Sequence, residues 1–259
     1  MQNHDRSARR AKFTLAGIGV LLAAAVAAGA VAAVGVLGSD DKAAPPAAKP
    51  SASTPAPSPS GLWNKDMTPA KAKPFHLVAP TGQANGISTG FPHNTKGAIS
   101  TAVYFTEEYA LLDDQKARQQ LEAAVSPDAP GYVDERVSQV RKLREGAGLP
   151  PSGGNPAGLT FTTSVKAVRA KTIRADGLPL GDAIHVWLVY DRYATGPDGG
   201  ADKNPLRDET SDLILKWQNG AWKLTNEPKL WAKRTYPVAY APDSPYAWQD
   251  GWWQVLRED

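Results

Sequence analysis

Cysteine is absent from the 259 residues of the chain. Its absence excludes disulfide bonds, thiolate metal sites, a cysteine nucleophile and a membrane anchor made by lipidated cysteine. A domain outside the cytoplasm would therefore be stabilised by its hydrophobic core alone. An excess of one charge is also lacking, because the formal net charge of +3 is too small to predict a nucleic-acid surface.

Metal-binding and nucleotide-binding motifs are missing as well. The four histidines stand at positions 4, 76, 93 and 185, and no two have the i, i+4 spacing of a zinc-binding helix. No Walker-type loop is present, and residues 198–204 offer oxygen ligands without the spacing of a calcium loop. The sequence therefore predicts that the protein is not an enzyme and has no catalytic residue, metal ion or cofactor.

What the chain does have is one long apolar stretch, Phe13 to Leu37, without a charged residue. As a helix it would be roughly 37 Å long, enough to cross a hydrocarbon core of about 30 Å with some tilt. Basic residues precede it, and Asp40 and Asp41 follow it, so the positive-inside rule places the N-terminus in the cytoplasm. We expect a single-pass anchor in the cell membrane with the remaining chain extracytoplasmic.

A cleaved signal peptide is the alternative, with Ala28-Gly29-Ala30 as the cleavage site. The apolar run continues past that site, which favours a retained anchor. Proline, alanine and serine then dominate the chain, and this linker is expected to be disordered and extended because it cannot build a core. The expected organisation is a basic cytoplasmic N-terminus (1–12), a transmembrane helix (13–37), the linker (38–74), an α+β extracytoplasmic domain (75–230) and an aromatic-rich tail (231–259).

The first helix of the domain is predicted after residues 82–90, which are expected to form a loop. Asn94 or Thr95 is its N-cap, and apolar residues spaced by three and four run from Ala98 to Leu112. The helix extends to Val125 at the furthest. The pair Asp113-Asp114 would then lie on its exposed flank.

A second helix is predicted from Tyr132 to Glu145, ended by Gly146 and Gly148. Its apolar stripe includes Val137 and Val140. The opposite, polar face carries Asp134, Glu135, Arg136, Arg141 and Lys142.

From residue 159 the apolar period changes to two, which predicts strands. Residues 159–173 alternate through Val165 and Ala167 on one face. Residues 183–193 are apolar on both faces, as in a central strand. One face carries Ile184, Val186, Leu188 and Tyr190, and the other carries His185, Trp187 and Val189.

The pair Asn219-Gly220 predicts a two-residue hairpin turn, because both positions of such a turn need positive φ. This turn pairs Trp217 with Trp222, so that these tryptophans fall on one apolar face. Lys216 and Lys223 then oppose each other on the other face, which indicates an open, wet surface.

Helices followed by antiparallel strands define an α+β domain, with the helices laid on one face of a curved antiparallel sheet. This order, ending in Trp-Gln-Asn-Gly-Ala-Trp-Lys-Leu (217–224), resembles the nuclear transport factor 2-like, or cystatin-like, cone. With its anchor and spacer, the layout resembles the membrane-anchored extracytoplasmic subunits of Gram-positive conjugative elements and type IV secretion systems. The run Gly-Phe-Pro-His-Asn-Thr-Lys-Gly-Ala (90–98) is also similar to one found in small membrane proteins of mobile elements in high-GC Gram-positive bacteria.

The resemblance covers residues 90–224 and implies a non-enzymatic scaffold or assembly subunit of a conjugation or secretion apparatus. The implied partners are other membrane or envelope proteins, with no direct contact to nucleic acid, and homo-oligomerisation is left open.

Two other functions are kept as alternatives. One is a cell-envelope module that binds glycan through the tail, whose candidate interaction residues are Tyr246, Trp248, Trp252 and Trp253. Packing of this tail on its own domain is the favoured structural interpretation. The other is a small-molecule-binding or isomerase-like cone, with His185, Tyr190 and Asp191 as its candidate pocket.

Overall fold

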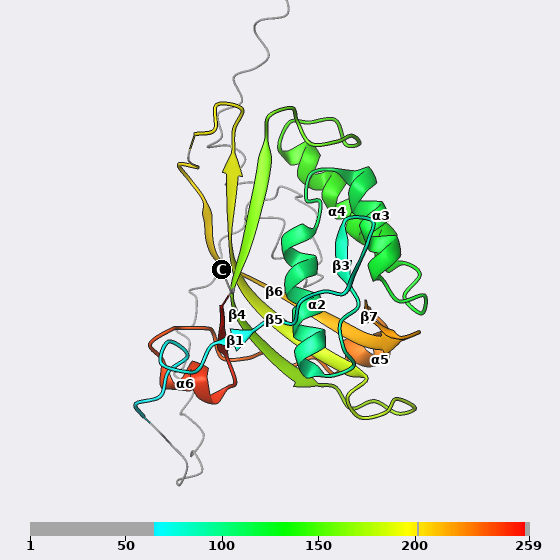
Figure 1. The fold of residues 1–259 in the computed structure, drawn as a ribbon. Coiled ribbons are helices and arrows are strands. Elements are labelled where there is room, and N and C mark those ends of the chain that lie inside the picture. Colours follow the sequence, from blue (N-terminus) through cyan, green and yellow to red (C-terminus); the bar gives the residue numbers. More distant parts are fainter. Residues whose placement is uncertain (1–64, 201, 257–259) are drawn as a thin grey trace, which may run out of the picture.

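The computed structural model describes residues 65–200 and 202–256. The predicted N-terminus, transmembrane segment and most of the linker lie outside the described residues. Within the described ranges, no helix combines the length and apolarity needed to span a membrane. The described chain forms an α+β domain in which three helices pack against a strongly curled, six-stranded and mostly antiparallel sheet (Figure 1).

The elements follow the predicted order of helices first and long strands second. The helices are α2 (Thr95–Glu108), α3 (Asp114–Ala124), α4 (Tyr132–Gly146) and the short α5 (Pro228–Trp231) and α6 (Pro245–Gln249). The strands are β1 (Phe75–His76), β2 (Gly82–Ala84), β3 (Ile87–Thr89), β4 (Thr160–Thr172), β5 (Ala183–Thr195), β6 (Leu206–Gln218), β7 (Ala221–Leu224) and β8 (Trp253–Leu256). The large sheet has the order β1-β8-β4-β5-β6-β7, and β1 runs parallel to β8.

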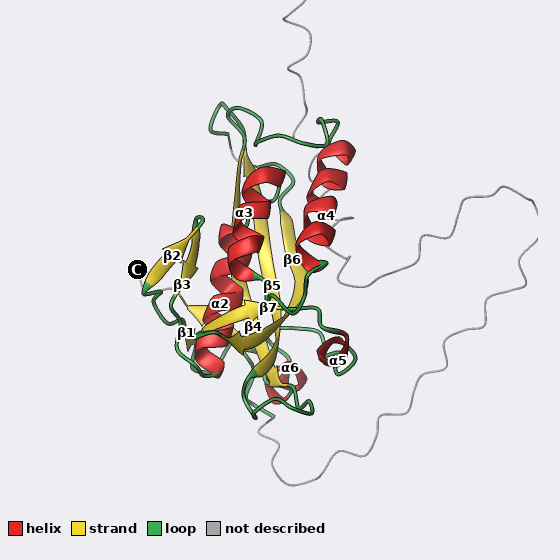
Figure 2. Cartoon of the chain, turned by 90° about the vertical axis from the view of Figure 1, so that its right-hand side faces the viewer, coloured by secondary structure: helices red, strands yellow, loops and turns green. Residues whose placement is uncertain are grey.

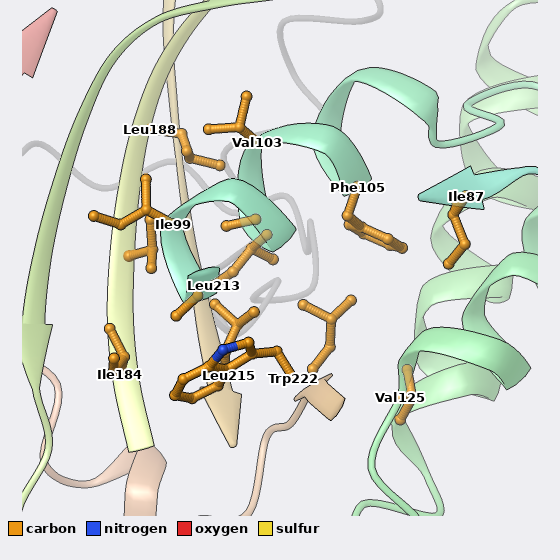
Figure 3. Packing of buried hydrophobic residues seen from close by; sticks show 14 of the residues in the cluster. Ile87, Ile99, Val103, Phe105, Val125, Ile184, Leu188, Leu213, Leu215 and Trp222 are labelled. Carbon is orange, nitrogen blue, oxygen red and sulfur yellow. The ribbon is translucent and has the colours of Figure 1, made fainter. Parts of the chain in front are cut away.

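Strand β5 is the centre of the sheet and is covered on both faces, as predicted. Every residue from Ala183 to Arg192 is buried. The concave face of β5 packs against the helices, and Figure 3 shows Ile184 and Leu188 facing Ile99 and Val103 of α2. On the opposite face, a separate cluster is formed by Ala167, Trp187, Val189, Ala247 and Trp252. The sheet is therefore one layer between two covers.

The alternation predicted for β4 is wrong beyond Val165, because the strand contains a bulge. Val165 pairs with Tyr190 and Ala167 pairs with Val189, so Lys166 is an extra residue. Ala167 therefore lies on the face opposite Val165, while Val168 returns to the core beneath the helices. A bulge increases the local bend and twist of a strand, which fits the strong curl of this sheet.

A second irregularity lies in the pairing of β5 with β6, where β6 contains one residue more than β5. The pairing of β5 with β6 shifts between Tyr190 and Arg192, and Asp191 lies at the shift. The Lys166 ammonium contacts the Asp191 carboxylate at 2.8 Å. Burial raises the pKa of Asp191, but the hydrogen bonds from Lys166 and the Asp208 N–H outweigh burial and lower that pKa overall. The ion pair thus joins the two irregular positions.

The β6–β7 hairpin has the predicted register. Trp217 pairs with Trp222 across a turn in which Asn219 and Gly220 have φ of 52° and 77°. The prediction of an open, wet face beside it is wrong. Lys216 is buried, and its ammonium forms ion pairs with Glu227 at 2.8 Å and with Asp128. Lys223 donates to the carbonyl of Ala123 at the end of α3.

Residues 82–90 form the β2–β3 hairpin rather than the predicted loop. Its turn is Asn85-Gly86, with φ of 51° and 80°, the same turn chemistry as in the larger hairpin. Ile87 enters the core cluster beneath α2. The strands are three residues each, too short for their alternation to be recognised.

The long helix expected up to Val125 is two helices, α2 and α3, which lie with α4 on one face of the sheet (Figure 2). The first ends where Tyr109 becomes extended, with φ −65° and ψ 130°. The second starts at Asp114, and the side chain of Asp113 before it accepts a hydrogen bond from the Lys116 N–H at 2.9 Å and acts as the N-cap.

Asp114 is buried, so the prediction of an exposed flank is wrong for this residue. Its carboxylate accepts hydrogen bonds from Arg141 (2.9 Å), the Gly153 N–H (2.8 Å) and the Ser152 hydroxyl (3.0 Å). Burial alone would raise the pKa of Asp114, but these three donors outweigh burial and lower it to about 2. The carboxylate thereby connects α3, α4 and the loop after α4.

Asp114→Asn removes this charge and is expected to cost about 2 kcal/mol of unfolding free energy near neutral pH. Because the folded pKa is depressed, the contribution is present above the unfolded pKa and is lost as pH falls towards the folded value of about 2. Urea unfolding at a series of pH values measures the effect. The wild-type advantage should shrink between about pH 5 and about pH 2.

Asp113→Asn is the matched control, because asparagine caps a helix as well as aspartate does. Its stability should differ little from that of wild type over the same range. Equal losses in the two variants, or a pH-independent loss in Asp114→Asn, would contradict the assigned role of Asp114.

Candidate functional site

The run of residues 90–98 lies where α2 meets the β6–β7 hairpin. The Trp222 indole N–H donates to the Pro92 carbonyl at 2.9 Å. The His93 ring stacks on Trp217, with centroids 4.3 Å apart and planes 5° apart. Its Nε2 atom lies 2.7 Å from the Asp182 carboxylate. These contacts hold the start of α2 against both hairpin tryptophans, which is a structural role for the motif.

Gly97 is required by the same arrangement. Its N–H donates to the side-chain oxygen of Asn94 at 2.8 Å, which confirms Asn94 as the N-cap. A Cβ atom at Gly97 would lie 2.0 Å from the Pro92 carbonyl oxygen. Since that oxygen also accepts from Trp222, it cannot move without breaking the contact between α2 and the hairpin.

The aromatic C-terminal segment, residues 232–256, packs on the domain and completes the sheet. Strand β8 lies between β1 and β4, where Trp253 pairs with Val168. Trp252 is only 3% exposed, and its indole N–H donates to the Val238 carbonyl at 2.7 Å. Trp252 is therefore a core residue, which leaves it unavailable to a partner.

The other candidate residues of this segment are more accessible. Tyr246 is 61% exposed. Trp248 and Trp253 are partly buried and meet edge to face, with centroids 5.0 Å apart. The C-terminal segment thus keeps one exposed tyrosine and one partly accessible tryptophan pair.

His185, Tyr190 and Asp191 do not converge on one pocket. His185 lies on the convex face, 2.7 Å from the Asp212 carboxylate, with its ring centroid 3.8 Å from that of Trp187. Asp191 is six residues further along the strand, roughly 20 Å away at strand spacing. Tyr190 lies on the concave face and lines a cavity beneath the helices.

The convex hollow beside His185 is open and basic. It has a volume of about 360 Å³ and is lined by Lys171, Thr172, Ile173, Arg174, His185, Trp187, Lys233 and Thr235. Asp212, the partner of His185, also lies 3.7 Å from the Arg234 guanidinium. The carboxylate is thus shared between a histidine and an arginine, which gives it a structural role between β6 and the start of the C-terminal segment.

The concave cavity lies between α2, α4 and the sheet and has a volume of about 80 Å³. Its polar lining includes Tyr109, Arg136, Gln139, Tyr190, Arg192 and Ser211. Burial raises the pKa of Tyr109 to about 12, although the nearby charge of Arg136 acts in the opposite direction. Neither arginine was predicted as a cavity residue. Arg136 belongs to the predicted polar face of its helix, and the apolar alternation of β5 gives no signal for Arg192.

Residues 86–90 match the Gly-x-Ser-x-Gly pattern of serine hydrolases, a match missed among the sequence motifs. In those enzymes the serine lies on a sharp turn between a strand and a helix. Here Ser88 lies within β3, and its hydroxyl and N–H both donate to the Glu108 carboxylate, at 2.7 and 2.6 Å. The serine is therefore a link between the small hairpin and α2.

In comparisons with known proteins, no family model, no curated protein and no solved structure matches this chain.

Gly97→Ala tests the contact between α2 and the hairpin. The added methyl group must displace the Pro92 carbonyl or the first turn of α2, so we expect a loss of roughly 2–3 kcal/mol in unfolding free energy. Gly131→Ala is the control, since Gly131 also starts a helix, has φ of −80° and has nothing within 4 Å of its Cβ position. Its cost should stay below about 1 kcal/mol. Chemical denaturation giving equal costs for the two variants would contradict the close approach at Gly97.

Proposed function

We propose that the chain is a single-pass, membrane-anchored, non-enzymatic scaffold or assembly subunit of a conjugation or secretion apparatus. Its extracytoplasmic domain would bind other membrane or envelope proteins. Support for the anchor is the uncharged stretch Phe13 to Leu37, followed by a Pro-rich linker.

The fold agrees with this proposal at a coarse level. Helices cover the concave face of a half-barrel sheet, as in the nuclear transport factor 2-like or cystatin-like cone that the sequence resembles. We propose that finer fold assignment together with the function, since the order of helices, long strands and final hairpin supports it.

The observation that carries the proposal is the position of the exposed apolar side chains. Among the described residues, five large apolar side chains are exposed, and four of them lie in the C-terminal segment: Tyr236 (86%), Val238 (48%), Tyr246 (61%) and Leu256 (48%). Aromatic and apolar groups that stay accessible in a folded domain are typical of protein interfaces.

This surface lies beside the point where the linker enters the domain. The Ala70 N–H donates to the Pro242 carbonyl at 3.0 Å, and Phe75 of β1 pairs with Val255 of β8. Figure 1 shows the cyan segment at the start of the described chain beside the red C-terminal segment, at one edge of the sheet. A partner bound there would meet both the tether and the C-terminal segment, which suits a subunit assembled next to a membrane.

Glycan binding is the second candidate function, favoured by the exposed Tyr246 ring and by the partly accessible pair Trp248 and Trp253 in the same segment. Aromatic rings of this kind can stack on sugars as well as on protein side chains.

Crosslinking of the full-length protein in its native membranes tests the interface. The double variant Tyr236→Ala, Tyr246→Ala should lose about tenfold or more of its crosslinks to other envelope proteins, since hot-spot aromatics each contribute more than about 1 kcal/mol. Leu180→Ala is the control, because Leu180 is 68% exposed but lies in the β4–β5 turn region outside the C-terminal segment. It should crosslink like wild type.

Recovery of proteins of a transfer machine supports the proposal, whereas recovery of abundant bystanders alone contradicts it. Crosslinks only between copies of the chain would replace it with self-assembly. Binding to purified peptidoglycan that is lost in the double variant and kept in Leu180→Ala would favour the glycan function instead.

A further inference from the structure

The concave cavity contains polar groups that the domain itself leaves unsatisfied. Beside these polar groups, the cavity is lined by Phe105, Thr106, Leu111, Val140, Leu143 and Leu213. The cavity lies at the side where α4 packs mainly against α3 rather than against the sheet. It is separate from the C-terminal segment and from the convex hollow.

Arg192 is the most informative group in this lining. Its side chain is 7% exposed, and its Nε atom donates to the Thr163 hydroxyl at 2.9 Å, which orients the guanidinium group. The guanidinium carbon lies 4.9 Å from the ring centroid of Tyr190. Its Nη1 atom, however, is buried without any hydrogen-bond partner. A buried, unpaired donor on a charged group destabilises the fold unless a ligand satisfies it.

The Tyr109 hydroxyl shows the same deficit on the other wall of the cavity, where Arg136 also lies. The Tyr109 hydroxyl is buried without a hydrogen-bond partner. The Arg136 guanidinium carbon lies 5.9 Å from the Tyr109 ring centroid and 6.0 Å from that of Tyr132. Its environment is thus aromatic, and α4 brings this second cation to the same cavity as Arg192.

No carboxylate neutralises these two arginines at close range. Within residues 65–200 and 202–256, neither Arg136 nor Arg192 forms an ion pair within 4.0 Å. Glu135 and Glu209 contribute only longer-range attraction to them. Two cations in a partly dry cavity favour an anionic ligand, and guanidinium groups match the planar, two-oxygen geometry of a carboxylate.

The rest of the lining indicates the kind of anion. Phe105, Leu111, Val140, Leu143 and Leu213 present hydrocarbon, which offers nothing to the outer oxygens of a free phosphate or sulfate. An acid with a small apolar body satisfies both parts of the lining. A cavity of about 80 Å³ suits a compact molecule rather than an extended chain.

We infer that the concave cavity binds a small amphipathic carboxylic acid. Its carboxylate lies between Arg192 and Arg136, within reach of the Tyr109 hydroxyl, and its hydrocarbon part packs against the leucine and valine side chains of the lining. This inference goes beyond the proposed scaffold function and does not depend on it.

Calorimetric titration of the full-length protein in detergent, with empty micelles as the blank, tests the site. The probes are acetate, butyrate, benzoate, inorganic phosphate and the neutral benzyl alcohol. We expect saturable 1:1 binding that strengthens from acetate to butyrate, by up to roughly tenfold for the two added methylene groups. Benzoate should also bind more tightly than acetate, while phosphate and benzyl alcohol should bind at least tenfold more weakly than benzoate.

Arg192→Gln should weaken benzoate binding at least tenfold, because a charge-assisted pair with the buried guanidinium is lost. Arg136→Gln is a second, independent variant, from a different element, in case the first fails to fold. Arg207→Gln is the control, since Arg207 is exposed on β6 outside the cavity lining, and it should bind like wild type.

The inference is overturned by absence of saturable benzoate binding in the folded wild-type protein. It is equally overturned if benzyl alcohol binds as well as benzoate, if phosphate binds more tightly than benzoate, or if Arg207→Gln loses as much affinity as the two cavity variants. Loss of partner crosslinks in the interface experiment would leave this result unchanged, so the two proposals fail separately.

Discussion

The burial of β5 on both faces is the constraint on which the rest of the domain depends. A strand with apolar residues on both sides needs two covers, and two different parts of the chain provide them. The helices cover the concave face, and the C-terminal segment covers Trp187 and Val189 on the other. Leaving either of these two side chains in water would cost about 1.5–3 kcal/mol. The C-terminal segment is therefore a layer of the fold, and only its outermost side chains, such as Tyr236, remain exposed.

The helices and the C-terminal segment pack against the two faces of the sheet with different closeness. The candidate sites lie where this packing is incomplete. Helix α2 lies close to the sheet because Ala98 and Ala102 are completely buried against it. Helix α4 packs mainly on α3, so a cavity with two arginines remains beside it. The short C-terminal segment leaves a basic hollow uncovered on the convex side, and its own Tyr236 and Tyr246 rings remain exposed. The proposed partner surface and the proposed ligand cavity thus lie on opposite covers of one sheet.

Local signals in the sequence predicted the parts of the fold that local chemistry decides. Asn219-Gly220 determines the register of β6 and β7, and Asn94 determines the start of α2. The bulge at Lys166 and the burial of Asp114 were not predictable in this way, because both depend on partners far along the chain, such as Asp191 and Ser152. The cavity was not predicted for the same reason. In the sequence Arg136 has the pattern of a solvent-exposed helix residue, and only its contacts with distant strands show that it lines a cavity. The β2–β3 hairpin could have been predicted, because Asn85-Gly86 carries the same turn signal as Asn219-Gly220.

Native-state hydrogen exchange of the full-length protein tests the central claim most directly, namely that the C-terminal segment is a structural layer of the domain. The account predicts that the backbone N–H groups of β8 exchange as slowly as those of β4, to which they are paired at Ala167 and Val168. They should also lose protection together with the β5 amides as denaturant is added. Exchange of the β8 amides at the rate of an unfolded chain, while β5 stays protected, would contradict the account.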